Sequence, residues 1–212
     1  MKGLLKKDLL LVAKGWPSMV LITVLIGAAM IWMKGGSGLV TFLTIYMMMQ
    51  GITTLVSDKM SGWNELATNL PVSRAAAIRE KYVVSVLLYA LSFPVGLALT
   101  MWLADDQTSV LVSVLLSVVF AFSALAIGVP ALVRLHRSYF FAGILASFIP
   151  AAVMVTVWSR SIEAVMTMTA SGPVYTVDMA TGLLGWMAAG SAAAALVSML
   201  VMPNILSRYD QN

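Results

Sequence analysis

The sequence contains no cysteine, and only 10% of its 212 residues are charged. Without cysteine, a disulfide framework, a thiolate metal site and a cysteine nucleophile are all excluded. A soluble domain of this size needs roughly 25% charged residues to cover its surface, so a soluble globular domain is excluded as well. Disorder is excluded because 60% of the residues are hydrophobic and the mean hydropathy is +0.94. The composition therefore predicts an integral membrane protein.

The residues that nucleotide, metal and proton chemistry would need are also missing. The chain has no G-x-x-x-x-G-K-[ST] segment and so does not bind ATP through a P-loop of its own. A single histidine, His136, cannot by itself form a metal site or a catalytic triad. No ionisable residue occupies the middle of an apolar stretch, which disfavours ion-coupled carriers and proton pumps. We predict a non-catalytic chain that binds no metal and no cofactor.

Six stretches are apolar and close to the length of a membrane-spanning helix, which needs about 20 apolar residues to cross a bilayer core of about 30 Å. Their bounds are Pro17–Met33, Leu39–Ser57, Tyr82–Ala104, Ser109–Val133, Tyr139–Trp158 and Gly182–Met202. None of the 13 basic and 9 acidic residues lies within them except at their edges. The stretches lack the period-two alternation of barrel strands, which indicates helices. We expect residues 1–212 to form one all-α membrane domain, a bundle of six transmembrane helices.

The basic residues indicate an orientation rather than a nucleic-acid partner. They lie in short segments between apolar runs and not in an aromatic-interleaved patch, so the net charge of +4 does not point to nucleic acid. With both termini inside, the inner segments hold Lys2, Lys6, Lys7, Lys14, Lys59, Arg74, Arg79, Lys81, Arg134, Arg137 and Arg208. The outer segments hold only Lys34 and Arg160. Because basic residues near span ends resist translocation, we expect both termini in the cytoplasm.

The first 16 residues have the pattern of an amphipathic helix that lies at the membrane surface. Leucines and Val12 share one arc of a helical wheel, and all four lysines of residues 1–14 take the other, where they would face anionic headgroups. Asp8 is the exception, because it projects into the apolar arc. Two interpretations stay open for Asp8. It is either an exposed charge near a helix end or the partner of Arg79 or Lys81 in an ion pair.

The long inner loop, residues 58–81, contains a second amphipathic segment. Apolar residues recur at helical spacing over Trp63–Leu70, so this segment is predicted to be a short helix that Pro71 ends. Ser73 has the position of an N-cap for the next helix, and the alanines that follow it favour helix formation. A short helix parallel to the membrane could contact a soluble partner. Short surface helices without a partner are, however, also common.

Three further features leave alternatives open. Gln50, one turn after Tyr46, either forms an interhelical hydrogen bond or lines a translocation path, to which Tyr46, Gln50 and Tyr89 are the candidate contributors. The small residues Gly182, Gly185, Ala189 and Ala193 predict close helix packing, either within the chain or against a second copy. Residues 159–181 are predicted to form a short-helix element on the outer side. This element either lies on the surface or re-enters the bilayer.

The inner loop carries the residues by which the chain resembles a known family. The pattern consists of Asp58-Lys59, Trp63, Asn69-Leu70-Pro71-Val72-Ser73-Arg74, Ile78 and Lys81-Tyr82, together with the Lys7-Asp8-Leu9 step in the N-terminal helix. It resembles the bacterial small permeases of the type-2 ABC exporter family. That branch includes permeases similar to those exporting phenol-soluble modulins and other amphipathic or antimicrobial peptides.

This resemblance implies a permease subunit in the bacterial plasma membrane. The helix between the second and third spans would be a coupling helix that docks on a separate ABC ATPase, which would bind ATP and Mg²⁺. The residues implied in ATPase coupling are Trp63, Glu65, Leu66, Asn69, Leu70 and Pro71. A second permease, either identical or a paralogue, would complete a dimer, and the substrate would be a hydrophobic or amphipathic molecule such as a peptide. The composition is also compatible with a membrane-embedded sensor or immunity protein that binds a peptide without transporting it.

Overall fold

The computed structural model describes residues 2–32, 38–63, 73–104, 107–134, 149, 151–156, 159 and 174–209. Within these ranges the chain forms helices joined by short turns, and no strand is present. The long elements are α1 (Lys2–Lys14), α2 (Trp16–Trp32), α3 (Leu39–Met60), α5 (Arg74–Leu103), α6 (Gln107–Arg134) and α8 (Val174–Tyr209). The prediction of an all-α protein is confirmed for the described part of the chain.

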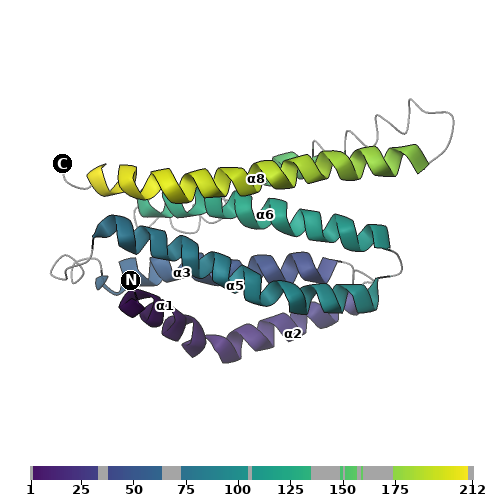
Figure 1. Cartoon of the computed structure of the whole chain (residues 1–212). Coiled ribbons are helices and arrows are strands. Elements are labelled where there is room, and N and C mark those ends of the chain that lie inside the picture. Colours follow the sequence, from purple (N-terminus) through teal and green to yellow (C-terminus); the bar gives the residue numbers. More distant parts are fainter. Residues whose placement is uncertain are drawn as a thin grey trace.

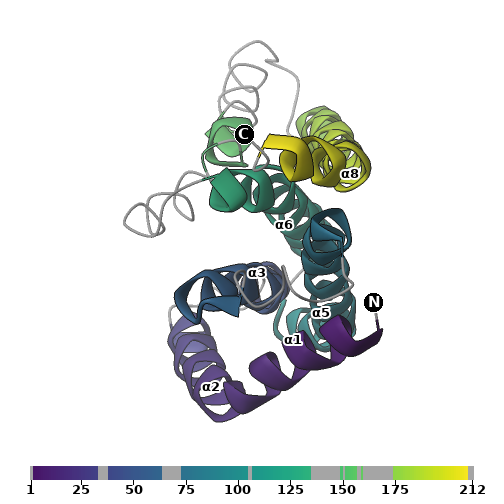
Figure 2. The same cartoon turned by 90° about the vertical axis from the view of Figure 1, so that its left-hand side faces the viewer.

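The helices α3, α5, α6 and α8 run side by side along one direction, with α1 and α2 along one edge (Figure 1). The view along the bundle places α3 and α5 between the pair α1–α2 and the pair α6–α8 (Figure 2). The start of α1, the start of α5 and the last turns of α3 and α8 share one end of the bundle (Figure 1). We call this the charged end, because Asp58, Lys81 and Asp8 meet there.

Four helical segments are long and apolar enough to cross a membrane, namely Leu39–Met60, Arg74–Leu103, Gln107–Arg134 and Thr181–Ile205. A fifth crossing is possible if α1 and α2, which meet at a bend of 49°, count as one span. The chain is therefore a multi-pass membrane protein. Of the predicted span Tyr139–Trp158, residues 149 and 151–156 are described and helical, and the rest lies outside the described residues. The number of six spans and the orientation of the termini stay predictions.

The helices α3 and α5 continue beyond the predicted apolar stretches into charged residues. The helix α3 extends past Ser57 to Met60 and carries Asp58 within its last turn. The helix α5 begins at Arg74, directly after the predicted cap Ser73, and runs into the apolar stretch that opens at Tyr82. Ser73 caps it as predicted, since its hydroxyl accepts a hydrogen bond from the backbone N–H of Ala76 at 3.2 Å. Helical hydrogen bonding thus continues where hydropathy falls, and it brings ionisable side chains into the bundle.

Glycine allows α3 and α5 to pack closely as antiparallel neighbours. A Cβ atom on Gly51 would lie 2.6 Å from Cα of Ser85, and one on Gly96 would lie 3.0 Å from Cα of Val40. Close to the second contact, the backbone N–H of Val40 donates to the Thr100 hydroxyl at 2.9 Å. Small residues permit this kind of backbone approach between helices in lipid. The two helices are thereby held in one register.

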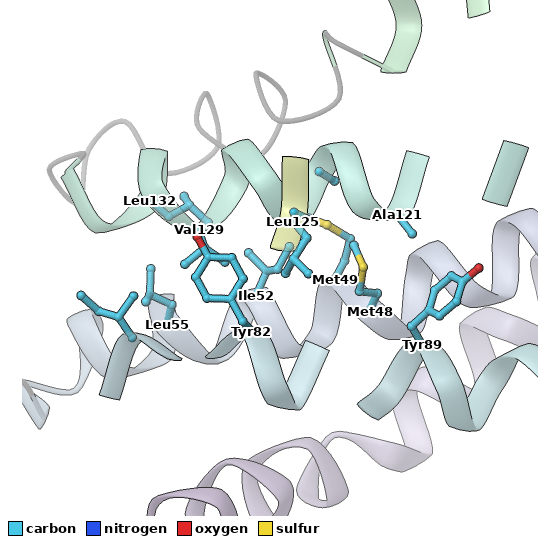
Figure 3. Close-up of a cluster of buried hydrophobic side chains, with 13 residues drawn as sticks. Met48, Met49, Ile52, Leu55, Tyr82, Tyr89, Ala121, Leu125, Val129 and Leu132 are labelled. Carbon is cyan, nitrogen blue, oxygen red and sulfur yellow. The ribbon is translucent and has the colours of Figure 1, made fainter. Parts of the chain in front are cut away.

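The main core lies between α3, α5 and α6, with a contribution from α8. Its fully buried members include Met48, Ile52 and Tyr82, which meet Leu125 and Val129 of α6 (Figure 3). The Tyr82 hydroxyl lies 2.7 Å from that of Ser198 on α8. Because the Ser198 hydroxyl donates to the carbonyl of Ala126 at 2.8 Å, it accepts from Tyr82. This chain of hydrogen bonds links α5, α8 and α6 inside an apolar environment.

The small-residue face of α8 is largely uncovered by the described part of the chain. Gly182, Ala189 and Ala193 are exposed, and a Cβ atom on Gly182 or Gly185 would meet nothing within 4 Å. The helix instead packs on α6 through the neighbouring face, where Leu184 and Ala188 are buried. The sequence left two alternatives for this face, packing within the chain or packing against a second copy. Packing within the chain is not observed for this face among the described residues.

Candidate functional site

The helix α1 packs on the bundle through a face that contains an aspartate. Leu4, Asp8 and Val12 are spaced by four residues and are all buried, with Asp8 at 0% exposure. The Asp8 carboxylate lies 2.5 Å from Nζ of Lys81. Of the alternatives for Asp8, the ion pair with Lys81 is confirmed. Arg79 instead donates to the side-chain carbonyl of Asn204 at 2.9 Å.

A second lysine and a second aspartate complete what we call the ionic network, which consists of Lys7, Asp8, Asp58 and Lys81. Nζ of Lys81 contacts Asp58 at 2.6 Å as well as Asp8. Nζ of Lys7 lies 2.6 Å from Asp58 and 3.2 Å from Asp8. Each lysine therefore touches both aspartates. The network joins α1, α3 and α5 at the charged end of the bundle.

The ionic network is balanced in charge and almost dry. The exposed fractions of its side chains are 4% for Lys81, 0% for Asp8 and 9% for Asp58, whereas Lys7 is 23% exposed. Lys81 also donates to the Thr54 hydroxyl at 3.2 Å. Charges in a dry environment are tolerated only when opposite charges and hydrogen bonds offset their desolvation. Loss of any one member would leave a buried charge without its counterpart.

Glu80 adds a further carboxylate beside the ionic network. It is 3% exposed, and its Oε1 accepts no hydrogen bond within the described residues. The buried group around α1 and α5 therefore contains one more acidic than basic side chain.

Trp63 follows the end of α3, and its ring contacts Lys7 of α1. Ser61 ends the helix, and Gly62 has a φ of 71°, a left-handed conformation that favours glycine. Nζ of Lys7 then lies 4.4 Å from the centroid of the Trp63 ring, at cation–π distance. Lys7 thus connects α1 with the first residue of the predicted coupling helix. The other residues predicted for coupling, Glu65, Leu66, Asn69, Leu70 and Pro71, lie outside the described residues.

The prediction that all four N-terminal lysines face headgroups was wrong for Lys7. Lys6 and Lys14 are exposed, but Lys7 turns toward Asp58. The attraction between the ammonium group and the two carboxylates is stronger in this poorly hydrated site than it would be in bulk water, because the effective dielectric constant is lower there. Sequence reasoning missed this role of Lys7, although its neighbour Asp8 in the apolar arc was a usable signal.

Lys59 connects α3 to a different helix. Its ammonium group donates to the carbonyls of Leu132 at 2.5 Å and Val133 at 2.8 Å, near the end of α6. These carbonyls belong to the last turn, which has no intrahelical donors and carries the negative end of the helix dipole. Asp58 and Lys59 therefore hold α1, α5 and α6 from one turn of α3. This capping role was also missed from sequence.

The candidate path residues lie in two different environments. Tyr46 stacks on Phe42 at a centroid distance of 5.8 Å, and one turn later the Gln50 side chain forms no hydrogen bond within the described residues. A hollow of ≈ 570 Å³ follows on α3, lined by Thr53, Val56, Ser57, Met60 and Ser61. Tyr89 is instead buried in the main core, where its hydroxyl lies 3.1 Å from that of Ser117. The path assignment itself stays a prediction.

The comparisons with known proteins identify a family for the chain. A model of the family described as ABC-2 family transporter protein matches residues 3–205. The chain belongs to this family. An ABC-2 chain is a transmembrane component of an ABC transporter, and membership implies association with an ABC ATPase and with the membrane. The searches of curated proteins and of solved structures gave no match.

The ABC-2 assignment gives the ionic network a wider meaning. Lys7, Asp8, Asp58 and Lys81 are all among the residues that carry the sequence resemblance, although they are far apart along the chain. The fold brings them into direct contact at the charged end. Part of the motif of this ABC-2 permease is therefore a single three-dimensional site and not a series of separate loop signals.

Proposed function

We propose that this ABC-2 permease is the membrane subunit of an ATP-driven exporter that moves hydrophobic or amphipathic molecules, chiefly peptides, out of a bacterial cell. A separate ATPase would bind ATP and Mg²⁺, and a second permease copy or a paralogue would complete the membrane domain. The observation that carries this proposal is the meeting of four motif residues and Trp63 at one end of the bundle. That end would face the cytoplasm and hold residues 58–81 against the ATPase.

The proposed substrate class is supported by one face of α3. Tyr46, Gln50 and the hollow beyond them follow each other at helical spacing and combine aromatic, amide, hydroxyl and aliphatic groups. Such a surface suits a molecule with one polar and one apolar side. A transport assay in membrane vesicles distinguishes an exporter from a protein that only binds the peptide. ATP-dependent accumulation of a labelled amphipathic peptide supports the exporter, and binding without accumulation would support a peptide sensor.

The coupling role is tested by the double substitution Glu65→Ala and Leu66→Ala. We expect normal amounts of permease in the membrane but weaker co-purification with the ATPase and less transport. Truncation of an apolar anchor at an interface typically costs about 2 kcal/mol or more, which is about thirtyfold in affinity. Thr68→Ala, in the same loop but off its apolar face, is the matched control. Full ATPase binding by the double variant would show that this loop is not the coupling element.

The proposed orientation is tested with introduced cysteines, because the natural chain contains none. Cysteines at Ser61 or Ser138 should be protected from an impermeant thiol reagent in intact cells. Cysteines at Ser37 or Thr108 should be labelled, and all four should react after the membrane is opened. The reverse pattern of labelling would place the charged end outside the cell and remove the basis for ATPase docking.

A further inference from the structure

Lys7 differs from the other lysine of the ionic network in what it adds. Lys81 contacts both Asp8 of α1 and Asp58 of α3, so it can hold α1 on the bundle without Lys7. Lys7 repeats the contact with Asp58 and adds the ring of Trp63, at 4.4 Å. Its exposed fraction of 23%, against 4% for Lys81, places it at the rim of the network. The contact that only Lys7 supplies is therefore the contact with Trp63.

The geometry around Trp63 makes this contact important for the loop that follows. Gly62 has the left-handed φ of 71°, a conformation that glycine adopts without steric cost. Trp63 is the first residue of the predicted coupling helix and the one residue of that helix that the structure describes. A cation over an indole ring is attracted to the face of the ring, and more strongly where water is partly excluded. The Asp58 carboxylate at 2.6 Å holds the ammonium group in place for this role.

We propose that Lys7 is the positioning residue of the coupling loop and that α1 acts through it to fix Trp63. This inference rests on the proposed function, because it assumes that the loop after Trp63 contacts the ATPase. Lys81 would then anchor α1, and Lys7 would set the direction in which the chain leaves α3. Loss of Lys7, at the rim, should loosen the loop and cost the bundle far less stability than loss of the buried Lys81, so ATP hydrolysis would proceed with less transport.

The first test measures Trp63 in the isolated permease, without the ATPase. The other five tryptophans, Trp16, Trp32, Trp102, Trp158 and Trp186, are replaced by phenylalanine, so that the remaining fluorescence comes from Trp63. We expect Lys7→Gln to increase the rate of acrylamide quenching about threefold. Lys7→Arg should keep the original rate, because a guanidinium group also binds carboxylates and stacks on indole. Lys6→Gln, at the exposed neighbouring lysine, is the matched control and should change nothing.

The second test uses the permease with all six tryptophans, reconstituted with its ATPase. The amount of a dye-labelled amphipathic peptide transported per ATP hydrolysed should fall about threefold in Lys7→Gln, with Lys7→Arg and Lys6→Gln near the wild-type ratio. Thermal stability should fall far less in Lys7→Gln than in Lys81→Met. A purely structural role of Lys7 would not change the ratio of transported peptide to hydrolysed ATP, since fewer folded molecules reduce transport and hydrolysis equally.

Three results would overturn the proposal. These are unchanged Trp63 quenching in Lys7→Gln, an equal effect of Lys6→Gln, and an unchanged ratio of transport to hydrolysis. A wild-type permease that does not bind the ATPase would instead overturn the proposed function. The two failures can be told apart, because the quenching measurement contains no ATPase. If the five phenylalanine replacements prevent folding, the ratio in the natural tryptophan background still decides.

Discussion

Replacement of Lys81 by methionine is expected to lower the free energy of unfolding by about 3–5 kcal/mol, the usual cost of removing one partner from a buried ion pair. Lys81 is 4% exposed and contacts both aspartates of the ionic network, so the variant leaves two buried carboxylates that only Lys7 can balance. We expect a large loss of permease from the membrane and a much lower midpoint of thermal unfolding in detergent.

Two further variants test whether the loss of stability comes from the unbalanced charge of the ionic network. Lys6→Met makes the same chemical change at an exposed site and should leave the melting temperature within a few degrees of wild type. Lys81→Met combined with Asp8→Asn restores the balance, since the pair of Lys7 and Asp58 at 2.6 Å remains. This double variant should recover part of the lost stability. A single Lys81→Met variant as stable as Lys6→Met would mean that water reaches the ionic network.

Replacement of Gly51 by alanine is expected to produce the second large effect. The new Cβ atom would lie 2.6 Å from Cα and 2.7 Å from N of Ser85, and backbone atoms cannot rotate away as a side chain can. The helices α3 and α5 would have to separate, and overpacking of this kind typically costs about 1–3 kcal/mol. We expect a clear drop in the melting temperature of the detergent-solubilised protein.

Gly190→Ala on α8 is the matched control for Gly51→Ala. It lies in a helix and is exposed, and a Cβ atom there would meet nothing within 4 Å. Alanine is also the better helix former, by about 1 kcal/mol, so this variant should be as stable as the wild type or slightly more so. Equal destabilisation by the two substitutions would contradict close packing between α3 and α5.

Hydropathy predicted most of the described helices well because they contain long apolar segments, whereas α1 was predicted from its amphipathic pattern. At the charged end, the apolar stretches stop short of the ends of α3 and α5. A hydropathy profile falls as soon as Asp58 or Lys81 is reached, whereas backbone hydrogen bonding continues through both residues. Paired charges of opposite sign can enter a bundle because each offsets the desolvation of the other. A profile evaluated along a single segment contains no information about partners on another helix.

The candidate site was accessible from sequence only in part. Asp8 within an apolar arc indicated an inward-facing charge, and Lys81 was one of the two partners considered. The role of Lys7 was not predicted, because it depends on how α1 docks and on where the turn at Gly62 places Trp63. Tyr89 was grouped with Tyr46 and Gln50 by polarity alone. Its burial against α6 is a property of the packed bundle and is not encoded by local periodicity.

The ionic network also sets an order of events during biosynthesis. Asp8 and Lys81 are 73 positions apart, and Lys7 and Asp58 are 51 positions apart. Chains are made from the N-terminus, so α1 leaves the ribosome long before its lysine partner in α5 exists. Docking of α1 must therefore wait until α3 and α5 have been synthesised and inserted. The first helix to be made is one of the later ones to reach its place.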